Sequence, residues 1–253
     1  MLKPTLPFNY FPPHNLLVQY EKAGEILDGA TSINVARLTP QWLQNAEEFQ
    51  GGFSCVKKAI WKDRTIVVKF LSTRRVVSSD AKSREQSFRR EIHVWHKLSH
   101  PNILPLLGVV CLEGAILGMA SPFMANGAAP GYINRNPEAD VFQIIQLCDV
   151  AEGLGYLAAQ TPPVAHGDLK GANVLIDSDG RACICDFGLS RFLGGHGSAD
   201  VSCFGTTRWM APEQLISDPM IVSLSADIFS WGMLALEVSH RLISITSTNP
   251  TTS

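Results

Sequence analysis

Cysteines are few in this sequence, and their spacing is not that of metal ligands or bridges. The 253 residues contain six cysteines, scattered mostly inside apolar stretches: Cys55, Cys111, Cys148, Cys183, Cys185 and Cys203. A structural zinc site needs paired ligands at characteristic spacing, which these six do not show. We therefore expect reduced thiols in a cytoplasmic protein rather than disulfide bridges.

The sequence also lacks a long uninterrupted apolar run and a strong net charge. Prolines break residues 1–20 repeatedly, so we expect no signal-peptide core there. Residues 103–123 are the most apolar stretch, but Pro105, Glu113 and several glycines interrupt them, which predicts short strands rather than a membrane span. The formal net charge of -2 at pH 7 gives no basic field for nucleic acid or an anionic membrane.

The composition that remains is that of an ordinary globular protein. Apolar residues make up 45% and charged residues 17% of the chain, which is too apolar for a disordered protein. Residues 1–44 show no clear period, and we expect an irregular extension there. The β-branched run at 65–70 predicts a strand, and Phe88, Ile92 and Trp95 then recur at helical spacing.

The second half of the chain is predicted to be mainly helical. Pro130-Gly131 predicts a turn, and Asn136-Pro137 is expected to begin a helix that runs to about residue 157. A later helix, residues 225–240, is apolar on almost every side and is expected to lie in a core. Strands first and helices later predict an α+β fold in two lobes.

Three short motifs follow one another in this second half. They are His166-Gly167-Asp168-Leu169-Lys170-Gly171-Ala172-Asn173, Asp186-Phe187-Gly188 and Ala211-Pro212-Glu213. In this order and at this spacing they resemble the catalytic loop, the metal-binding loop and the end of the activation segment of protein kinases. The resemblance covers residues 50–240 and implies a small β-rich N-lobe and a helical C-lobe. Kinases continue for several helices more, so the C-lobe is expected to lack its last helices.

The resemblance implies roles in phosphoryl transfer from ATP for four residues of these motifs. Asp168 would accept or orient the proton of the attacking hydroxyl, and Lys170 would offset charge on the transferred phosphate. Asn173 and Asp186 supply amide and carboxylate oxygens, which suit Mg²⁺. These residue types fit the reaction, because phosphoryl transfer depends mainly on positioning and electrostatic stabilisation.

Further residues are expected around the nucleotide. Lys69 resembles the lysine that holds the α and β phosphates, and Glu91 resembles the helical glutamate that pairs with it. Taken alone, a lysine after three aliphatic residues would more often be a strand-edge residue whose amine reaches solvent. The nucleotide-binding set that the resemblance implies is Gly51, Gly52, Val56, Val67, Lys69, Glu91, Met124 and Leu175.

The sequence departs from the kinase pattern at several positions. The phosphate-covering loop has Phe49 and Ser54 in place of glycines, which leaves its backbone less freedom to approach the phosphates. Val67 stands where the family usually has alanine and adds two methyl groups beside the adenine. Gly167 replaces an arginine that binds a phosphorylated activation loop, so activity is expected not to depend on that modification. His166 is expected to be a structural core residue.

The function implied is that of a protein serine/threonine kinase of the tyrosine-kinase-like group. Lys170, two residues after Asp168, and Gly205-Thr206 favour serine and threonine over tyrosine as acceptors. The alternative is a pseudokinase or scaffold, which the altered glycine loop and Val67 favour. A small-molecule kinase is disfavoured, because residues 205–213 resemble a platform for a peptide substrate.

The resemblance also sets the expected organisation and partners. Residues 1–44 form an N-terminal extension, 45–120 the N-lobe, 121–243 an incomplete C-lobe and 244–253 a disordered tail. ATP and a protein substrate are the expected partners, and a further protein is expected to cover apolar surface of the C-lobe. Nucleic acid and a membrane span are not expected.

Overall fold

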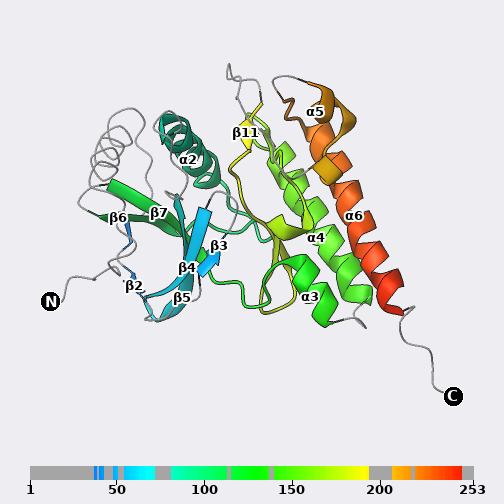
Figure 1. Ribbon diagram of the computed structural model, residues 1–253, viewed down its shortest axis with the longest axis horizontal. Helices are drawn as coiled ribbons and strands as arrows, with labels where there is room; N and C mark the ends of the chain where they lie inside the picture. The colour runs from blue at the N-terminus through cyan, green and yellow to red at the C-terminus, as the bar shows by residue number, and fades with distance from the viewer. Residues whose placement is uncertain are drawn as a thin grey trace. The chain divides into compact units, whose positions relative to one another are not determined.

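The computed structural model describes nine stretches of the chain. They are residues 37–38, 40–42, 48–50, 54–71, 81–112, 115–136, 140–193, 207–217 and 220–246. The chain divides into two compact units, the first made of Met1–Lys97 and Pro105–Phe123 and the second of Leu98–Leu104 and Met124–Ser253. Strands dominate the first unit and helices the second (Figure 1), which confirms the predicted α+β fold.

The first unit contains a seven-stranded sheet. Its strands are β1 Arg37–Leu38, β2 Gln41–Trp42, β3 Glu48–Gln50, β4 Ser54–Trp61, β5 Arg64–Leu71, β6 Gly108–Leu112 and β7 Ala115–Pro122. Their order across the sheet is β1-β6-β7-β5-β4-β2, and β3 also pairs with β4. Ile66 and Val68 alternate inward from β5 and are buried with Ala59 and Ala120 of the neighbouring strands. The predicted strand at 65–70 therefore lies at the centre of this sheet.

Helix α2, Ala81–Trp95, packs on β5 within the first unit. Phe88, Ile92 and Trp95 are buried on one side of it, as their helical spacing predicted. Glu91 lies on the same helix and is only 5% exposed. The helix thus brings a carboxylate to the strand that carries Lys69.

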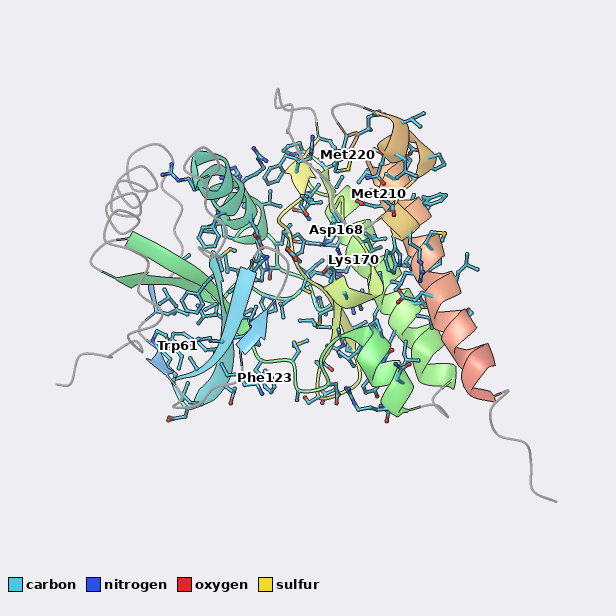
Figure 2. All side chains as sticks on the ribbon, in the orientation of Figure 1. Trp61, Phe123, Asp168, Lys170, Met210 and Met220 are labelled. Atoms are coloured by element: carbon cyan, nitrogen blue, oxygen red, sulfur yellow. The ribbon has the colours of Figure 1, made fainter. Side chains whose placement is uncertain are left out.

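The second unit combines helices with short strands. Its elements are α3 Ala129–Arg135, α4 Asp140–Ala158, β8 Val164–Ala165, η2 Gly171–Asn173, β9 Val174–Ile176, β10 Ala182–Ile184, β11 Arg191–Phe192, η3 Thr207–Trp209, α5 Pro212–Ile216 and α6 Leu224–Thr246. β9 pairs with β10 and β8 with β11, both antiparallel. Met210 and Met220, labelled in Figure 2, are buried with Ala165 and Val222. This cluster packs the segments on either side of α5 against β8.

Two local predictions for the second unit are wrong. Pro130-Gly131 lies inside α3, because proline is tolerated in the first turn of a helix, where backbone N–H groups have no partner within the helix. Asn136 ends α3 instead of beginning α4, since its backbone N–H binds the carbonyls of Tyr132 and Ile133. Its side chain also donates to the carbonyl of Tyr132.

Helix α6 was expected to be buried on all sides, and it is not. Ala226, Leu234 and Val238 are buried, but Ile228 and Leu236 are 65% and 62% exposed. The helix therefore has one packed side and one apolar side facing solvent. It runs to Thr246, so the first three residues of the expected tail are helical. None of the helices in the described stretches combines the length and apolar character that crossing a membrane requires.

Candidate active site

The catalytic loop, residues 166–173, is anchored to α6 through one carboxylate. Asp227 Oδ2 accepts the backbone N–H of His166 at 2.7 Å, and Oδ1 accepts that of Gly167 at 2.8 Å. Gly167 has φ +80°, a left-handed conformation that glycine adopts without steric cost. Burial raises the pKa of the Asp227 carboxyl, an effect larger than the opposing influence of His166 and the two backbone donors. Asp227 therefore fixes the turn that begins the loop.

Asp168 lies at the centre of a hydrogen-bonded group in this loop. Its Oδ2 accepts from Lys170 Nζ at 2.7 Å and from Asn173 Nδ2 at 3.0 Å. The same Asn173 amide donates to the Asp168 backbone carbonyl at 2.8 Å. The other carboxylate oxygen, Oδ1, is buried and has no hydrogen-bond partner among the described residues. Figure 2 labels Asp168 and Lys170 within the second unit. One oxygen of the carboxylate is thus held by two donors, while the other has no donor among the described residues.

The β9–β10 pair brings Asn173 beside Cys185, the residue before Asp186. Val174 lies opposite Ile184 in this pair, and the next residue along the chain, Cys185, donates its N–H to the Asn173 carbonyl at 2.9 Å. Asp186 follows directly, with φ 66°. Because the Asn173 side-chain nitrogen faces Asp168, its oxygen remains the acceptor end of the amide. An amide oxygen and a carboxylate at adjoining positions suit a hard divalent cation.

His166 is a fully buried structural residue, in agreement with its expected role. Its Nδ1 lies 3.3 Å from the backbone N–H of Asp168, so Nδ1 is the acceptor. Nε2 then carries the proton and donates to the Cys185 carbonyl at 3.1 Å. The ring also meets Phe187 edge-on, with centroids 5.3 Å apart. Both nitrogens are occupied by the backbone, which leaves neither for chemistry on a substrate.

In the first unit, Lys69 and Glu91 form the expected ion pair. Lys69 Nζ donates to Glu91 Oε1 at 2.7 Å. Val56 lies opposite Lys69 in the β4–β5 pair, and Val67 lies opposite Ser121 in the β5–β7 pair. Both valines are half-buried.

The other expected nucleotide-binding residues lie outside the described stretches or in the second unit. Gly51 and Gly52 lie outside the described residues. Met124 and Leu175 belong to the second unit, where the Met124 carbonyl accepts the N–H of Gly127 at 3.0 Å and Leu175 lies on β9. Because the set is shared between the two units, its meeting around one nucleotide stays a prediction.

Two α6 side chains near the catalytic loop were not identified from the sequence. Glu237 Oε2 accepts the indole N–H of Trp209 at 3.2 Å, and Ser230 Oγ lies 2.7 Å from the Trp209 carbonyl. The signal for them was available, because Asp227, Ser230 and Glu237 are the polar side chains within the otherwise apolar stretch 226–238 of this helix. Asp227, Ser230 and Glu237 fall on neighbouring sides of that helix.

A family model for the protein kinase domain matches residues 49–251. The chain belongs to the protein kinase domain family. Membership implies ATP, a divalent metal ion and a protein substrate in general. The hydrogen bond between Asp168 and Asn173 is thus found in a protein kinase domain.

Several curated relatives are similar to this protein kinase domain. Serine/threonine-protein kinase CTR1 of Arabidopsis thaliana is 30% identical over 193 residues, which are 75% of this chain and 23% of the relative. Probable serine/threonine-protein kinase SIS8 of the same plant is 34% identical over 155 residues, 60% of this chain and 15% of the relative. Putative L-type lectin-domain containing receptor kinase I.4, also from Arabidopsis thaliana, is 32% identical over 209 residues, 80% of this chain and 30% of the relative. The chain spans less than a third of the length of these relatives.

Proposed function

We propose that this protein is a serine/threonine kinase that transfers the γ-phosphoryl group of ATP to a protein hydroxyl. The observation that carries the proposal is the carboxylate of Asp168. Lys170 and Asn173 hold one oxygen, while Oδ1 is buried without a hydrogen-bond partner in the described part of the chain. A buried acceptor left without a donor costs free energy, so its retention favours a role in binding a ligand group. A substrate hydroxyl is a donor of the required kind.

The contacts of the loop residues support the roles that we propose for them. Asp168 Oδ1 would accept the proton of the attacking hydroxyl, because Oδ2 is already engaged. Lys170, whose ammonium lies 2.7 Å from Asp168, would place positive charge beside the transferred phosphoryl oxygens. Asn173 and Asp186 would hold a Mg²⁺ ion, which neutralises phosphate charge when it is bound.

The first unit would supply the phosphate-binding cation. Glu91 orients the Lys69 ammonium, and that ammonium would contact the α and β phosphates. Gly51, Gly52, Val56, Val67, Met124 and Leu175 complete the nucleotide site that we propose. The two-lobed arrangement implied by the family would bring the units together around ATP.

The acceptor class follows from the catalytic loop and the relatives. Lys170 stands two residues after Asp168, a position that favours serine and threonine acceptors, and two of the relatives carry the name of serine/threonine kinases. The rival function, a scaffold without catalysis, relies on the altered glycine loop and Val67. We favour the enzyme, because Asp168, Lys170 and Asn173 retain a connected set of contacts.

Phosphoryl transfer by the purified chain tests this proposal. Wild type and Asp168→Asn are incubated with Mg²⁺-ATP and a degenerate serine/threonine peptide library. We expect kcat to fall by about 10²- to 10⁴-fold in the variant, the range associated with loss of a general base. A thermal shift with Mg²⁺-ATP measures nucleotide binding separately, since a ligand of the folded state raises its stability. Equal turnover by the two proteins would refute catalysis at Asp168, and no thermal shift would favour the scaffold.

The proposal also covers the domain limits, the cellular location and a partner protein. The domain limits 1–44, 45–120, 121–243 and 244–253 stay predictions for the whole chain. The cytoplasmic location also stays a prediction; the described thiols of Cys148 and Cys183 are free, as that location would favour. A partner protein over the exposed apolar side chains of α5 and α6 likewise stays a prediction.

A further inference from the structure

Two imidazole rings lie beside each other at the C-terminal end of helix α2. His93 belongs to the last turn of the helix, and His96 directly follows its last residue, Trp95. The ring centroids are 5.7 Å apart, and the ring planes are inclined by 51° to each other. Both histidines are half-buried, and they share one side of the chain because residues three apart are neighbours on a helical surface. This end of α2 therefore offers two ring nitrogens to a ligand.

The helix backbone fixes which nitrogen of the His96 ring carries the proton. Its Nδ1 lies 2.9 Å from the carbonyl oxygen of Ile92, and a carbonyl oxygen can only accept a hydrogen bond. In the neutral ring Nδ1 is therefore protonated, and Nε2 keeps its lone pair. Histidines that bind metal ions are held in the same way, since a carbonyl that accepts from one ring nitrogen orients the ring and makes the other nitrogen a better ligand.

A lysine leaves the His93 ring in the same tautomer. Lys97 Nζ lies 3.4 Å from His93 Nε2, and an ammonium group can only donate a hydrogen bond. In the neutral ring Nε2 is therefore the acceptor, and Nδ1 carries the proton. The Nε2 lone pair of His93 thus already faces a positive charge. Both rings present Nε2 as the nitrogen that can bind a cation.

The separation of the two rings fits a pair of ligands on one metal ion. Zinc binds imidazole nitrogen at about 2.0–2.1 Å, so the centroids of two imidazoles on one tetrahedral ion lie roughly 5 Å apart. The centroids of His93 and His96 are 5.7 Å apart, so the rings would have to approach by less than about 1 Å. The helix adds to the attraction, because its aligned peptide dipoles favour a positive charge at the C-terminal end.

We propose that His93 and His96 form a binding site for a divalent transition-metal ion such as Zn²⁺, each through its Nε2 atom. Imidazole nitrogen suits Zn²⁺, Ni²⁺ and Cu²⁺, whereas Mg²⁺ prefers oxygen ligands. The site therefore differs in chemistry from the Mg²⁺ site proposed at Asn173 and Asp186. Within the described stretches no group of three or more His, Cys, Asp or Glu residues could hold a metal ion, so water would complete the coordination of the two imidazoles. The inference does not depend on the proposed kinase function.

Calorimetric titration of the full chain with Zn²⁺ tests the site. We expect His93→Gln and His96→Gln each to weaken Zn²⁺ binding by at least about tenfold, because loss of a residue that merely orients a metal ligand already costs about 10- to 100-fold. An excess of Mg²⁺ should leave the wild-type affinity unchanged. His100→Gln is the matched control, since the Nδ1 of His100 accepts the N–H of Asn102 at 3.1 Å, and it should bind Zn²⁺ like wild type. Wild-type affinity in both His93→Gln and His96→Gln would overturn the inference.

Removal of the neighbouring lysine charge should act in the opposite direction. Lys97→Gln should tighten Zn²⁺ binding about fivefold, because the ammonium competes for His93 Nε2 and repels a divalent ion a few ångströms away. Lys62→Gln removes the same charge from the exposed turn between β4 and β5, and it should leave the affinity unchanged. A gain in affinity cannot come from damage to the fold. Weaker binding in Lys97→Gln would contradict the proposed position of the ion.

Nuclear magnetic resonance of the imidazole nitrogens reports the metal bond itself. The chain has seven histidines, and in ¹⁵N-histidine-labelled protein His93→Gln and His96→Gln each remove and so assign one set of signals. The metal-free protein should show Nδ1 protonated in both rings. Zn²⁺ should then shift the Nε2 signals of His93 and His96 and leave those of His100 in place. Signals of His93 and His96 that do not respond to Zn²⁺, or a response at Nδ1 instead of Nε2, would overturn the inference.

Discussion

Two aspartates of the second unit use their carboxylates in opposite ways. Asp227 is 3% exposed, and each of its oxygens accepts a backbone N–H of the catalytic loop. Asp168, one residue beyond those N–H groups, has one oxygen held by two side chains and another without a partner in the described stretches. Both oxygens of Asp227 bind the backbone, whereas one oxygen of Asp168 has no donor in the described part of the chain.

The difference supports the proposal that Asp168, and not Asp227, takes part in chemistry. Backbone donors cannot turn away without moving the chain, so Asp227 is committed to the shape of the loop. A side-chain donor such as Lys170 can move toward a ligand, because its side chain is partly exposed. A carboxylate with mobile donors and an open oxygen can exchange partners during a reaction. The comparison therefore assigns a structural role to Asp227 and supports the catalytic role that we propose for Asp168.

Removing the two carboxylates should affect stability very unequally. Asp227→Ala leaves the N–H groups of His166 and Gly167 buried without acceptors, at about 1–3 kcal/mol each. We expect the free energy of unfolding, measured with urea, to fall by about 3 kcal/mol in total. Asp168→Ala should change it by less than about 1 kcal/mol, because the Lys170 side chain is partly exposed and its amine can turn to water. Equal losses in the two variants would break the comparison.

A smaller loss of stability is expected from a substitution at Gly167, in the turn that presents one of these N–H groups. Gly167 has φ +80°, and a Cβ there would lie 3.0 Å from Val222 Cγ1 and 3.1 Å from the Leu189 carbonyl. We expect Gly167→Ala to lower the free energy of unfolding by about 2 kcal/mol, from left-handed strain and crowding.

Gly155 provides the matched control for that substitution. It lies on α4, and a Cβ atom at this position would have no neighbouring atom within 4 Å among the described residues. Gly155→Ala should raise stability by about 0.5–1 kcal/mol, because alanine favours the helix over glycine. A loss at Gly155 as large as that at Gly167 would show that the turn has no special requirement.

The smallest expected effect is a pH dependence that belongs to Asp227. Burial raises the folded-state pKa of this carboxyl above its unfolded value. Its contribution to stability is therefore fully present below the unfolded pKa and is lost as pH rises through the raised folded pKa. Urea unfolding of wild type and Asp227→Asn should show the wild-type advantage shrinking as pH rises through that window. An advantage that grows with pH would mean that the backbone donors outweigh burial.

The sequence was sufficient to predict site residues that belong to recognisable motifs. Asp168, Lys170 and Asn173 lie within six positions, and the structure joins them by hydrogen bonds. The resemblance to protein kinases predicted Lys69 and Glu91 as a pair, and they form an ion pair. In both cases the structure contains a contact between the residues that the sequence predicted to act together.

Contacts that depend on distant packing could not be predicted in the same way. The approach of Glu237 to Gly171 depends on how α6 packs against η2, which no local pattern specifies. The exposed side of α6 was missed for the same reason, because an apolar residue such as Ile228 gives no sign of which neighbour is present. Asn136 was assigned to the wrong helix end, since asparagine can cap either end.

The contacts of helix α6 depend more strictly on the spacing of its residues than on the identity of most of them. Inserting one residue between Ser230 and Glu237 would rotate the glutamate by about 100° and move it about 1.5 Å along the axis. The carboxylate would then face away from Trp209, although every original side chain would still be in the sequence. Related chains can accordingly exchange the solvent-facing residues of this helix freely, while insertions and deletions in it should be eliminated by selection.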